Sequence, residues 1–261
     1  MSALLIRDGC YQGGRVRLGA VRTKVAGVLL AAGEGSRLGR PKALVELAGQ
    51  TLAERGVQLL RAGGADPILV VTGAVPVTPV QSGQIRTVYN ERWRTGMGSS
   101  LCAALVALSG TGLSGTGLSG TGLSGTGLSG TELSDVGAVV VALADQPMVG
   151  AVAVARLIAA YRDGASVAVA GYDGRPRNPV LLAREHWPEV LATAAGDQGA
   201  RAFLRARADL VTLIECGDTG RPDDIDTPED LERVARLASE NSASKIGGLE
   251  REPRIVREKR T

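Results

Sequence analysis

The chain has 261 residues, with 30 Lys+Arg against 27 Asp+Glu and a formal net charge of +3. Hydrophobic residues make up 44% of it, which is enough for a sizeable core and excludes wholesale disorder. Aromatic residues make up only 3%, which disfavours a single-stranded nucleic-acid binder that stacks bases, and the single histidine excludes a site with several histidine ligands.

Basic segments at both ends flank a mildly acidic middle. We expect residues 1–24, rich in Gly and Arg, to form a flexible extension and residues 241–261 to form a flexible basic tail, with a partner-binding role of the tail as the alternative. Residues 25–240 hold 19 Lys+Arg against 23 Asp+Glu, which argues against binding of nucleic acid or membranes. No apolar run reaches the roughly 18 residues of a spanning helix. The three cysteines are widely spaced without a CxxC pair, which favours a reducing, cytoplasmic location.

Apolar runs alternate with helical patterns through the middle of the chain. The run VAGVLLA at 25–31 is typical of a buried parallel strand, and GAVVVALAD at 137–145 is the most strand-like stretch. The alternation predicts an α/β fold, a Rossmann-like three-layer sandwich with a mostly parallel sheet, in one domain over residues 25–240. Further strands are expected at 67–73, 84–90, 166–172, 178–183 and 210–216, and helices at 51–62, 99–108, 152–161, 184–192, 199–208 and 228–239.

The first strand leads into a loop rich in glycine and positive charge, AAGEGSRLGRPK at 31–42. Its glycines let backbone N–H groups turn toward an anion, and Arg37 and Lys42 add cations. Lys42 is the only lysine between residues 25 and 240, where Arg is otherwise used. The loop is not a P-loop, because its lysine follows Pro41, and it lacks the GxGxxG of dinucleotide-binding proteins. The pattern therefore predicts a phosphate-binding loop of another kind.

Two aspartates follow extended segments and are candidates for holding a metal ion. Asp145 ends the strongest predicted strand, where open α/β sheets bind ligands, and Asp226 precedes a Thr-Pro helix start. Mg²⁺ takes one or two carboxylates together with phosphate oxygens, so we predict Asp145 and Asp226 as its ligands. Capping of the last helix is the alternative role for Asp226, and Asp224 is an alternative ligand.

Five further motifs accompany the loop, in an order that resembles one family. The segment LAAGEGSRLGRPKAL (30–44) resembles the signature LAAGxGxRxGxPKxL of the NTP-transferase superfamily. The others resemble the molybdenum cofactor cytidylyltransferase branch, over residues 25–237 apart from a repeat insertion. These motifs are NERW with GMGSSL (90–101), LADQP (143–147), NPVL (178–181), GDQGAR (196–201) and DIDTPEDL (224–231).

The resemblance implies a fold of the nucleotide-diphospho-sugar transferase type and transfer of CMP from CTP to molybdopterin with release of pyrophosphate. It implies Mg²⁺ as cofactor and Lys42 and Arg37 as catalytic residues. It also offers a molybdoenzyme or its chaperone as a candidate protein partner. Ala31-Ala32 goes with pyrimidine nucleotides in the family, which favours CTP and leaves GTP open. The implied nucleotide-binding residues are Leu30, Ala31, Ala32, Gly33, Gly35, Ser36, Arg37 and Lys42.

The acceptor side of the site is less defined by the sequence. Ser99 and Ser100 lie where a phosphate-bearing substrate would meet a helix N-terminus, although helix capping accounts for them equally well. Asn178 is implied by its motif, where the family more often has His. Open alternatives are guanylyl transfer, a phospholactate or sugar phosphate acceptor, a nucleotide-binding module without turnover, and a dinucleotide-dependent oxidoreductase, which the missing GxGxxG disfavours.

A repeat separates the helix at 99–108 from the strand at 137–145. The pentapeptide SGTGL occurs four times from Ser109 and is followed by SGTEL, which ends at Leu133. Gly at two positions in five makes the segment too flexible to pack a core, so we interpret residues 109–133 as a lengthened surface connection. A tether or partner-binding loop is the alternative.

Deletion of residues 109–133 with a short bridge should leave the fold and the activity unchanged, because lengthening a surface loop adds little closure entropy. Thermal unfolding and turnover of the deletion variant check this. A large fall in melting temperature would contradict the interpretation.

Overall fold

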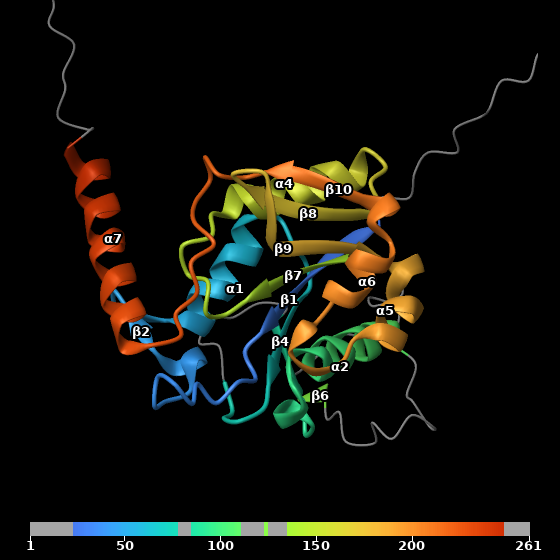
Figure 1. Ribbon diagram of the computed structural model, residues 1–261, viewed down its shortest axis with the longest axis horizontal. Coiled ribbons are helices and arrows are strands. Elements are labelled where there is room, and N and C mark those ends of the chain that lie inside the picture. Colours follow the sequence, from blue (N-terminus) through green and yellow to red (C-terminus); the bar gives the residue numbers. More distant parts are fainter. Residues whose placement is uncertain (1–22, 78–84, 111–122, 125–134, 248–261) are drawn as a thin grey trace, which may run out of the picture.

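The computed structural model describes residues 23–77, 85–110, 123–124 and 135–247. Within these residues one eight-stranded sheet forms the centre, in the order β10-β8-β9-β7-β1-β4-β5-β6 (Figure 1). Only β9 and β6 run antiparallel to the strands beside them, so the sheet is mostly parallel, as predicted. The strands are β1 (Lys24–Leu30), β4 (Ile68–Thr72), β5 (Ile85–Tyr89), β6 (Leu123–Ser124), β7 (Val136–Leu143), β8 (Val167–Tyr172), β9 (Arg175–Ala183) and β10 (Val211–Glu215).

Helices cover both faces of the sheet and complete three layers (Figure 1). Alternate residues of β1 point to opposite faces: Val28 is part of one buried cluster with α2, whereas Leu29 is part of another with α1. The run of apolar residues in this strand follows from burial on both sides. The helices are α1 (Leu52–Ala62), α2 (Met97–Ser109), α4 (Ala151–Arg162), α5 (Trp187–Thr193), α6 (Arg201–Ala206) and α7 (Pro228–Gly247).

The predicted strands and helices are all present, with shifts at several ends. Strand β9 begins at Arg175 rather than at 178, because Asp173 and Gly174, both with positive φ (52° and 71°), form a tight turn that pairs its first residues with β8. Helix α2 begins at Met97, directly after Gly96. Helix α7 continues to Gly247, past the predicted helix end at 239. The sequence predicts one helix at 184–192; the structure has a short 3₁₀ turn there, η3 (Arg184–His186), which leads directly into helix α5.

A small third core attaches α7 to the body of the protein. Val234 of α7 packs with Leu38 of the glycine loop, with Val45 just after that loop, and with Ile225. The same core includes Leu47, in the two-stranded ribbon of β2 (Glu46–Leu47) and β3 (Gln50–Thr51). In Figure 1, α7 accordingly stands beside β2, at one end of the sheet. This core holds the segment before α7 against the glycine loop.

Most of the repeat, residues 1–22 of the predicted extension and residues 248–261 of the predicted tail lie outside the described residues. The expectation of a flexible tail from residue 241 is corrected in part, because residues 241–247 belong to α7. Of the segment 109–133, Leu123 and Ser124 form β6, which pairs antiparallel with β5 at the edge of the sheet. Among the residues that the structure describes, no helix is long and apolar enough to cross a membrane.

Substitution of Thr51 by Ala should destabilise the fold by about 1 kcal/mol, because Thr51 begins α1 with a capping box. Its hydroxyl accepts a hydrogen bond from the Glu54 N–H (3.2 Å), and the Glu54 carboxylate accepts one from the Thr51 N–H (2.8 Å). Urea unfolding of Thr51→Ala measures the change, with Thr51→Ser as the control that keeps the hydroxyl. Equal stability of Thr51→Ala and the unsubstituted protein would contradict the assigned cap.

Candidate active site

A large cleft opens at the carboxyl ends of the central parallel strands. Its volume is about 1630 Å³. Leu30 ends β1 and Leu143 ends β7, the two are register partners, and both line the cleft. Ligands of open α/β sheets bind at this edge of the sheet. Of the residues predicted to form the site, all line the cleft except Ser99.

The glycine loop forms one wall of the cleft. Gly35 has a φ of +67°, and a Cβ there would lie 2.1 Å from the Arg40 carbonyl oxygen and 3.1 Å from Lys42 Cγ. The position therefore requires glycine, and the backbone of the loop lies directly against the stem of Lys42. Ser36, predicted to bind nucleotide, donates its hydroxyl to a Glu34 carboxylate oxygen (2.9 Å).

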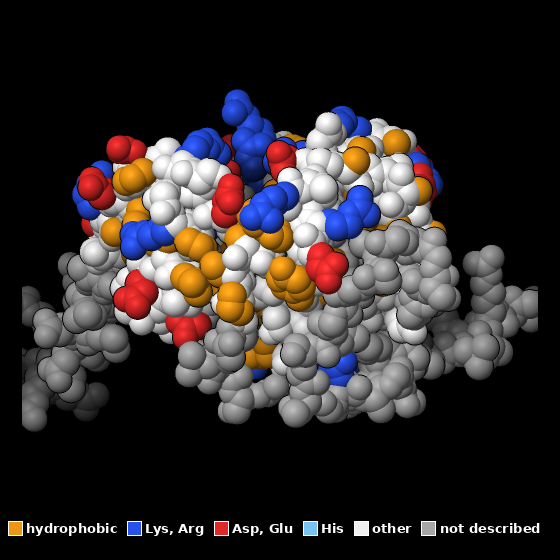
Figure 2. All heavy atoms as spheres, turned by 90° about the horizontal axis from the view of Figure 1, so that it is seen from below, with side chains coloured by type: hydrophobic (Ala, Val, Ile, Leu, Met, Phe, Trp, Pro, Cys, Tyr) orange, Lys and Arg blue, Asp and Glu red, His pale blue; other side chains and the backbone are white. Residues whose placement is uncertain are grey.

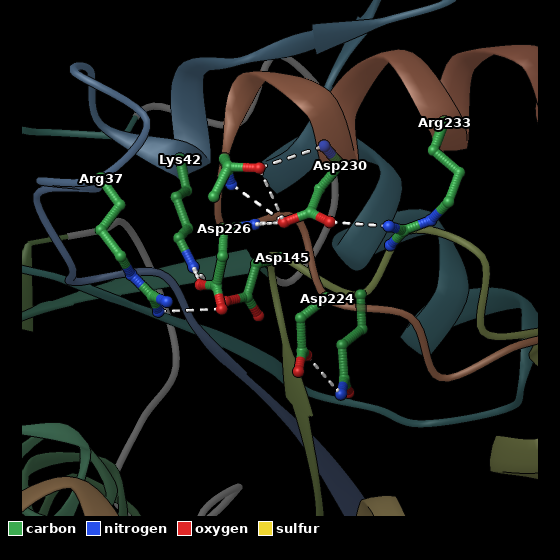
Figure 3. A network of polar contacts seen from close by, with 9 residues as sticks. Arg37, Lys42, Asp145, Asp224, Asp226, Asp230 and Arg233 are labelled. Carbon is green, nitrogen blue, oxygen red and sulfur yellow. Dashed lines mark hydrogen bonds and ion pairs between the residues drawn. The ribbon is translucent and has the colours of Figure 1, made fainter.

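Lys42 joins the two predicted metal ligands. Its Nζ lies 2.8 Å from Asp145 Oδ2 and 2.5 Å from Asp226 Oδ1. Arg37 Nη2 approaches the other oxygen of Asp226 at 2.9 Å. Figure 3 shows the two cations and the two carboxylates pointing toward one another from separate elements. Residues far apart in the sequence, 42, 145 and 226, thus form one charged cluster at the edge of the sheet.

The protonation states within this cluster follow from burial and pairing. Burial lowers the pKa of Lys42, but attraction and hydrogen bonds from Asp145 and Asp226 outweigh it and leave the pKa above its usual value. The hydrogen bond from Lys42 is the main reason why the pKa of Asp226 lies below its usual value. Both groups therefore keep their charges at neutral pH. Asp224 differs, because burial and then repulsion from Asp145 raise its pKa.

Asp226 is held in place by the first turn of α7. The Asp230 carboxylate accepts hydrogen bonds from the N–H groups of Asp226 (3.1 Å) and Thr227 (3.0 Å), and Arg233 donates to its other oxygen (Figure 3). The Thr227 hydroxyl accepts from the Asp230 N–H (3.3 Å), so Thr227 and not Asp226 caps the helix. The capping role considered for Asp226 is thereby corrected, and its side chain is left to face Lys42 and Arg37.

The residues around Asp145 fit a divalent cation that is shared with a phosphate ligand. Gln146 is 5% exposed and lines the cleft; its Nε2 donates to Asp224 Oδ1 (2.8 Å), and its Oε1 is buried without a hydrogen-bond partner in the described part of the chain. Oxygen donors of this kind suit Mg²⁺. Within the described ranges, no group of three or more His, Cys, Asp or Glu side chains is arranged to hold a metal. A cation here would therefore need further oxygens from the nucleotide and water.

The opposite wall of the cleft contains residues for which the sequence indicated no role. It is formed by Trp93 and Arg94 before α2, by Arg177 on β9 and by Arg201 and Arg205 on α6. The guanidinium of Arg94 lies 4.3 Å from the centroid of the Trp93 ring. Trp93 and Arg201 lie within motifs quoted above, so the family resemblance could have indicated them as site residues. Arg177 and Arg205 lie in none of these motifs.

The predicted acceptor residues Ser100 and Asn178 line this cleft, whereas Ser99 does not. The Ser99 hydroxyl lies within 2.8 Å of the Gly96 carbonyl oxygen, in the turn that precedes α2. Buried Asn90 donates to both serine hydroxyls, at 2.8 Å and 3.0 Å. Asn90 therefore fixes the turn to the helix, and contact of either serine with a substrate stays a prediction.

An open α/β sheet with a glycine-rich, cationic loop beside paired carboxylates at its carboxyl edge is typical of nucleotide-handling domains. The chain belongs to the family of MobA-like NTP transferase domains, whose family model matches residues 27–211. The expected superfamily is thus confirmed, as is the fold of the nucleotide-diphospho-sugar transferase type.

Proteins that are similar to this chain carry different names. The nicotine blue oxidoreductase of Paenarthrobacter nicotinovorans is 34% identical over 220 residues, which cover 80% of this chain and 96% of that protein. A probable molybdenum cofactor guanylyltransferase of Opitutus terrae is 37% identical over 95 residues, 36% of this chain and 46% of that protein. The crystal structure of the Rv0371c homologue from Mycobacterium sp. strain JC1 has a TM-score of 0.62 at 27% identity, covering 83% of this chain and 98% of that one.

Substitution of Gly35 by Ala should weaken nucleotide binding by tenfold or more, because the added Cβ would overlap the Arg40 carbonyl oxygen and shift the loop. Gly39→Ala is the matched control: Gly39 also has a positive φ (+74°), but a Cβ there meets nothing within 4 Å. Nucleotide affinity by calorimetry compares the two variants. Equal losses in both would indicate that backbone strain alone, and not the close approach at Gly35, determines the effect.

Proposed function

We propose that the protein transfers CMP from CTP to a phosphate-bearing acceptor of the molybdopterin type and releases pyrophosphate, with Mg²⁺ as cofactor. The observation that carries the proposal is the Lys42 ammonium between Asp145 and Asp226, beside the backbone of the glycine loop. Such a site offers phosphate-binding N–H groups, cations and metal ligands within one cleft. As part of the proposal the reaction takes place in the cytoplasm, consistent with the free thiols of Cys102 and Cys216.

Each group of residues has a role in this reaction. The backbone N–H groups around Gly33 and Gly35, together with Arg37, bind and orient the triphosphate. Lys42 stabilises negative charge that develops at the α-phosphate. Asp145 and Asp226 would hold Mg²⁺, which when bound neutralises charge on the phosphates.

The bond changes balance without a side-chain base. An acceptor phosphate oxygen attacks the α-phosphorus, a new P–O bond forms, and the bond between the α-phosphorus and the bridging oxygen breaks, so that pyrophosphate leaves with that oxygen. The attacking oxygen is already ionised at neutral pH, because a phosphate monoester has a second pKa near 6. The protein therefore needs to align and neutralise the reactants, not to remove a proton.

The choice of CTP over GTP rests on the loop residues Ala31 and Ala32. Both are buried and line the cleft, so their methyl groups reduce the room for a purine at the backbone. The relative named as a probable guanylyltransferase keeps GTP as the alternative nucleotide. The acceptor is proposed from the family resemblance, and a phospholactate or sugar phosphate is the alternative.

A second candidate function is that of a dinucleotide-dependent oxidoreductase. It is favoured by the 34% identity to a relative named nicotine blue oxidoreductase, which this chain matches over 96% of its length. Oxidation of NADPH in the presence of an oxidised heterocyclic dye tests it. Absence of NADPH binding would exclude this candidate.

Pyrophosphate release with Mg²⁺ and molybdopterin, measured separately for CTP, GTP, UTP and ATP, tests the proposed reaction. We expect release with CTP that is lost in Asp145→Ala. Release with GTP alone would overturn the role assigned to Ala31 and Ala32. Nucleotide binding without release from any nucleotide would favour another acceptor or a non-catalytic module.

Substitution of Lys42 by Ala should lower kcat by about 10²- to 10³-fold, the usual effect of losing one group that stabilises transition-state charge. Melting temperature should change much less than turnover. The control is Lys24→Ala, which removes a lysine that pairs with Asp66 at 3.8 Å outside the cleft. Full activity of Lys42→Ala would refute the assignment of the site.

Removal of divalent cations by EDTA should abolish pyrophosphate release, and excess Mg²⁺ should restore it. The reason is that without a divalent cation the triphosphate would meet Asp145 and Asp226 with no ion that binds carboxylate and phosphate oxygens together. Turnover that persists at full rate in EDTA would contradict the proposed cofactor.

A further inference from the structure

The cations of the site contact the same two carboxylates that would hold the metal ion. Lys42 contacts one oxygen of Asp145 and one of Asp226, and Arg37 contacts the second oxygen of Asp226 (Figure 3). Only one oxygen of the two carboxylates is left without a cation in these contacts. A divalent cation needs the same lone pairs, so it competes with the chain's own side chains.

Within these contacts the charges balance. Two carboxylates face one ammonium and one guanidinium, and three of the four groups are mostly buried, with side-chain exposures of 20% for Lys42, 23% for Asp145 and 29% for Asp226, whereas Arg37 is exposed. A divalent cation that enters alone must displace Lys42 and then lie next to it. A triphosphate changes this balance. Once a metal holds the carboxylates, the phosphate oxygens are better hydrogen-bond partners for Lys42 and Arg37 than those carboxylates are.

Both cations can move without a change in the backbone. Lys42 begins the short turn η1 (Lys42–Leu44), where its carbonyl accepts from the Val45 N–H (3.0 Å) and the next residue, Ala43, is buried. Its backbone is thereby fixed, while its four-carbon stem rests against Gly35 of the phosphate loop. Arg37 lies on that loop with a side chain that is 71% exposed. A rotation of either side chain therefore turns it from the carboxylates toward a phosphate on the loop.

We propose that Lys42 and Arg37 act as internal counter-ions that keep the metal site closed until nucleotide phosphates draw them away, so that metal and nucleotide bind cooperatively. The inference rests on the proposed function and deepens it, since it assigns the order in which the ligands of that site are accommodated. It gives Lys42 a role before catalysis as well as during it.

The expected size of the effect follows from population arithmetic. If the closed arrangement is populated at about 99 to 1, the apparent metal affinity falls about 100-fold below that of the open site. Coupling between two ligands of one protein is typically about 5- to 150-fold. By linkage, the metal must strengthen nucleotide binding by the same factor.

Binding of Mn²⁺ alone to the full chain, measured from the EPR signal of the free ion, tests the inference without turnover. We expect Lys42→Met to tighten Mn²⁺ binding about 5- to 150-fold and Arg37→Met to tighten it less, because Arg37 contacts a single carboxylate. Lys24→Met, which removes an equal charge outside the cleft, should leave the affinity unchanged. Thermal unfolding of each variant verifies that it is folded.

A second titration adds a CTP analogue with a methylene group between the α- and β-phosphates, corrected for the Mn²⁺ that the analogue binds without protein. The ratio of Mn²⁺ affinities with and without analogue should fall at least fivefold in Lys42→Met and stay unchanged in Lys24→Met. The inference would be overturned if Lys42→Met leaves the Mn²⁺ affinity unchanged or weaker and leaves this ratio unchanged.

The failure of the proposed function would look different. Asp145→Asn and Asp226→Asn should each remove Mn²⁺ binding from the protein with Met at position 42. If both leave it intact, the carboxylates do not hold the metal, and the proposed site fails with the inference. If they remove it while Lys42→Met has no effect, the proposed site stands and only the counter-ion role is lost.

Discussion

The parallel pairing of β1 with β7 is the constraint on which the site depends. The register runs from Val25 and Ala138 to Leu30 and Leu143, so both strands end at the same level. The glycine loop leaves the end of one strand and Asp145 follows the end of the other. Because hydrogen bonds across the sheet fix this register, the loop and the carboxylate face each other across a short gap. Lys42, at the far end of the loop, reaches Asp145 from there.

The third partner of this cluster comes from a different part of the structure. Asp226 is carried by the segment before α7, which the small core of Leu38, Val45, Ile225 and Val234 holds against the loop. The Asp230 carboxylate then fixes the backbone of Asp226 through a charge-assisted hydrogen bond. The loop that would bind phosphate and the segment that carries Asp226 are thus packed on one another. Stability of the C-terminal helix and geometry of the site are therefore linked.

The two walls of the cleft differ in chemistry. The wall of the glycine loop combines cations with carboxylates, whereas the opposite wall presents Arg177, Arg201 and Arg205 and the stacked pair of Trp93 and Arg94. The second wall is tied to the start of α2, since a Cβ at Gly96 would lie 2.4 Å from the backbone of Gly196. In the function that we propose, the nucleotide would lie on the first wall and the acceptor on the second, so that the two are held together for transfer. A relative that is 34% identical to this chain is named an oxidoreductase, which fits the general rule that one fold carries different activities.

The amino-acid sequence by itself determined the alternation of strands and helices, the glycine loop at the end of the first strand and the family, because these depend on local patterns: apolar runs buried on both faces, a glycine that no other residue can replace, and motifs of fixed spacing. It also indicated Lys42, Asp145 and Asp226 one by one. Only the tertiary structure decided that these three side chains touch, that Thr227 rather than Asp226 caps α7, and that Ser99 faces a turn rather than the cleft. The position of Arg177 and Arg205 in the cleft could not be predicted from the sequence either, because no motif distinguishes these exposed arginines from the many others in the chain. The physical reason is the same in each case: pairing across the sheet and packing of α7 bring together residues whose separation along the chain hides their proximity.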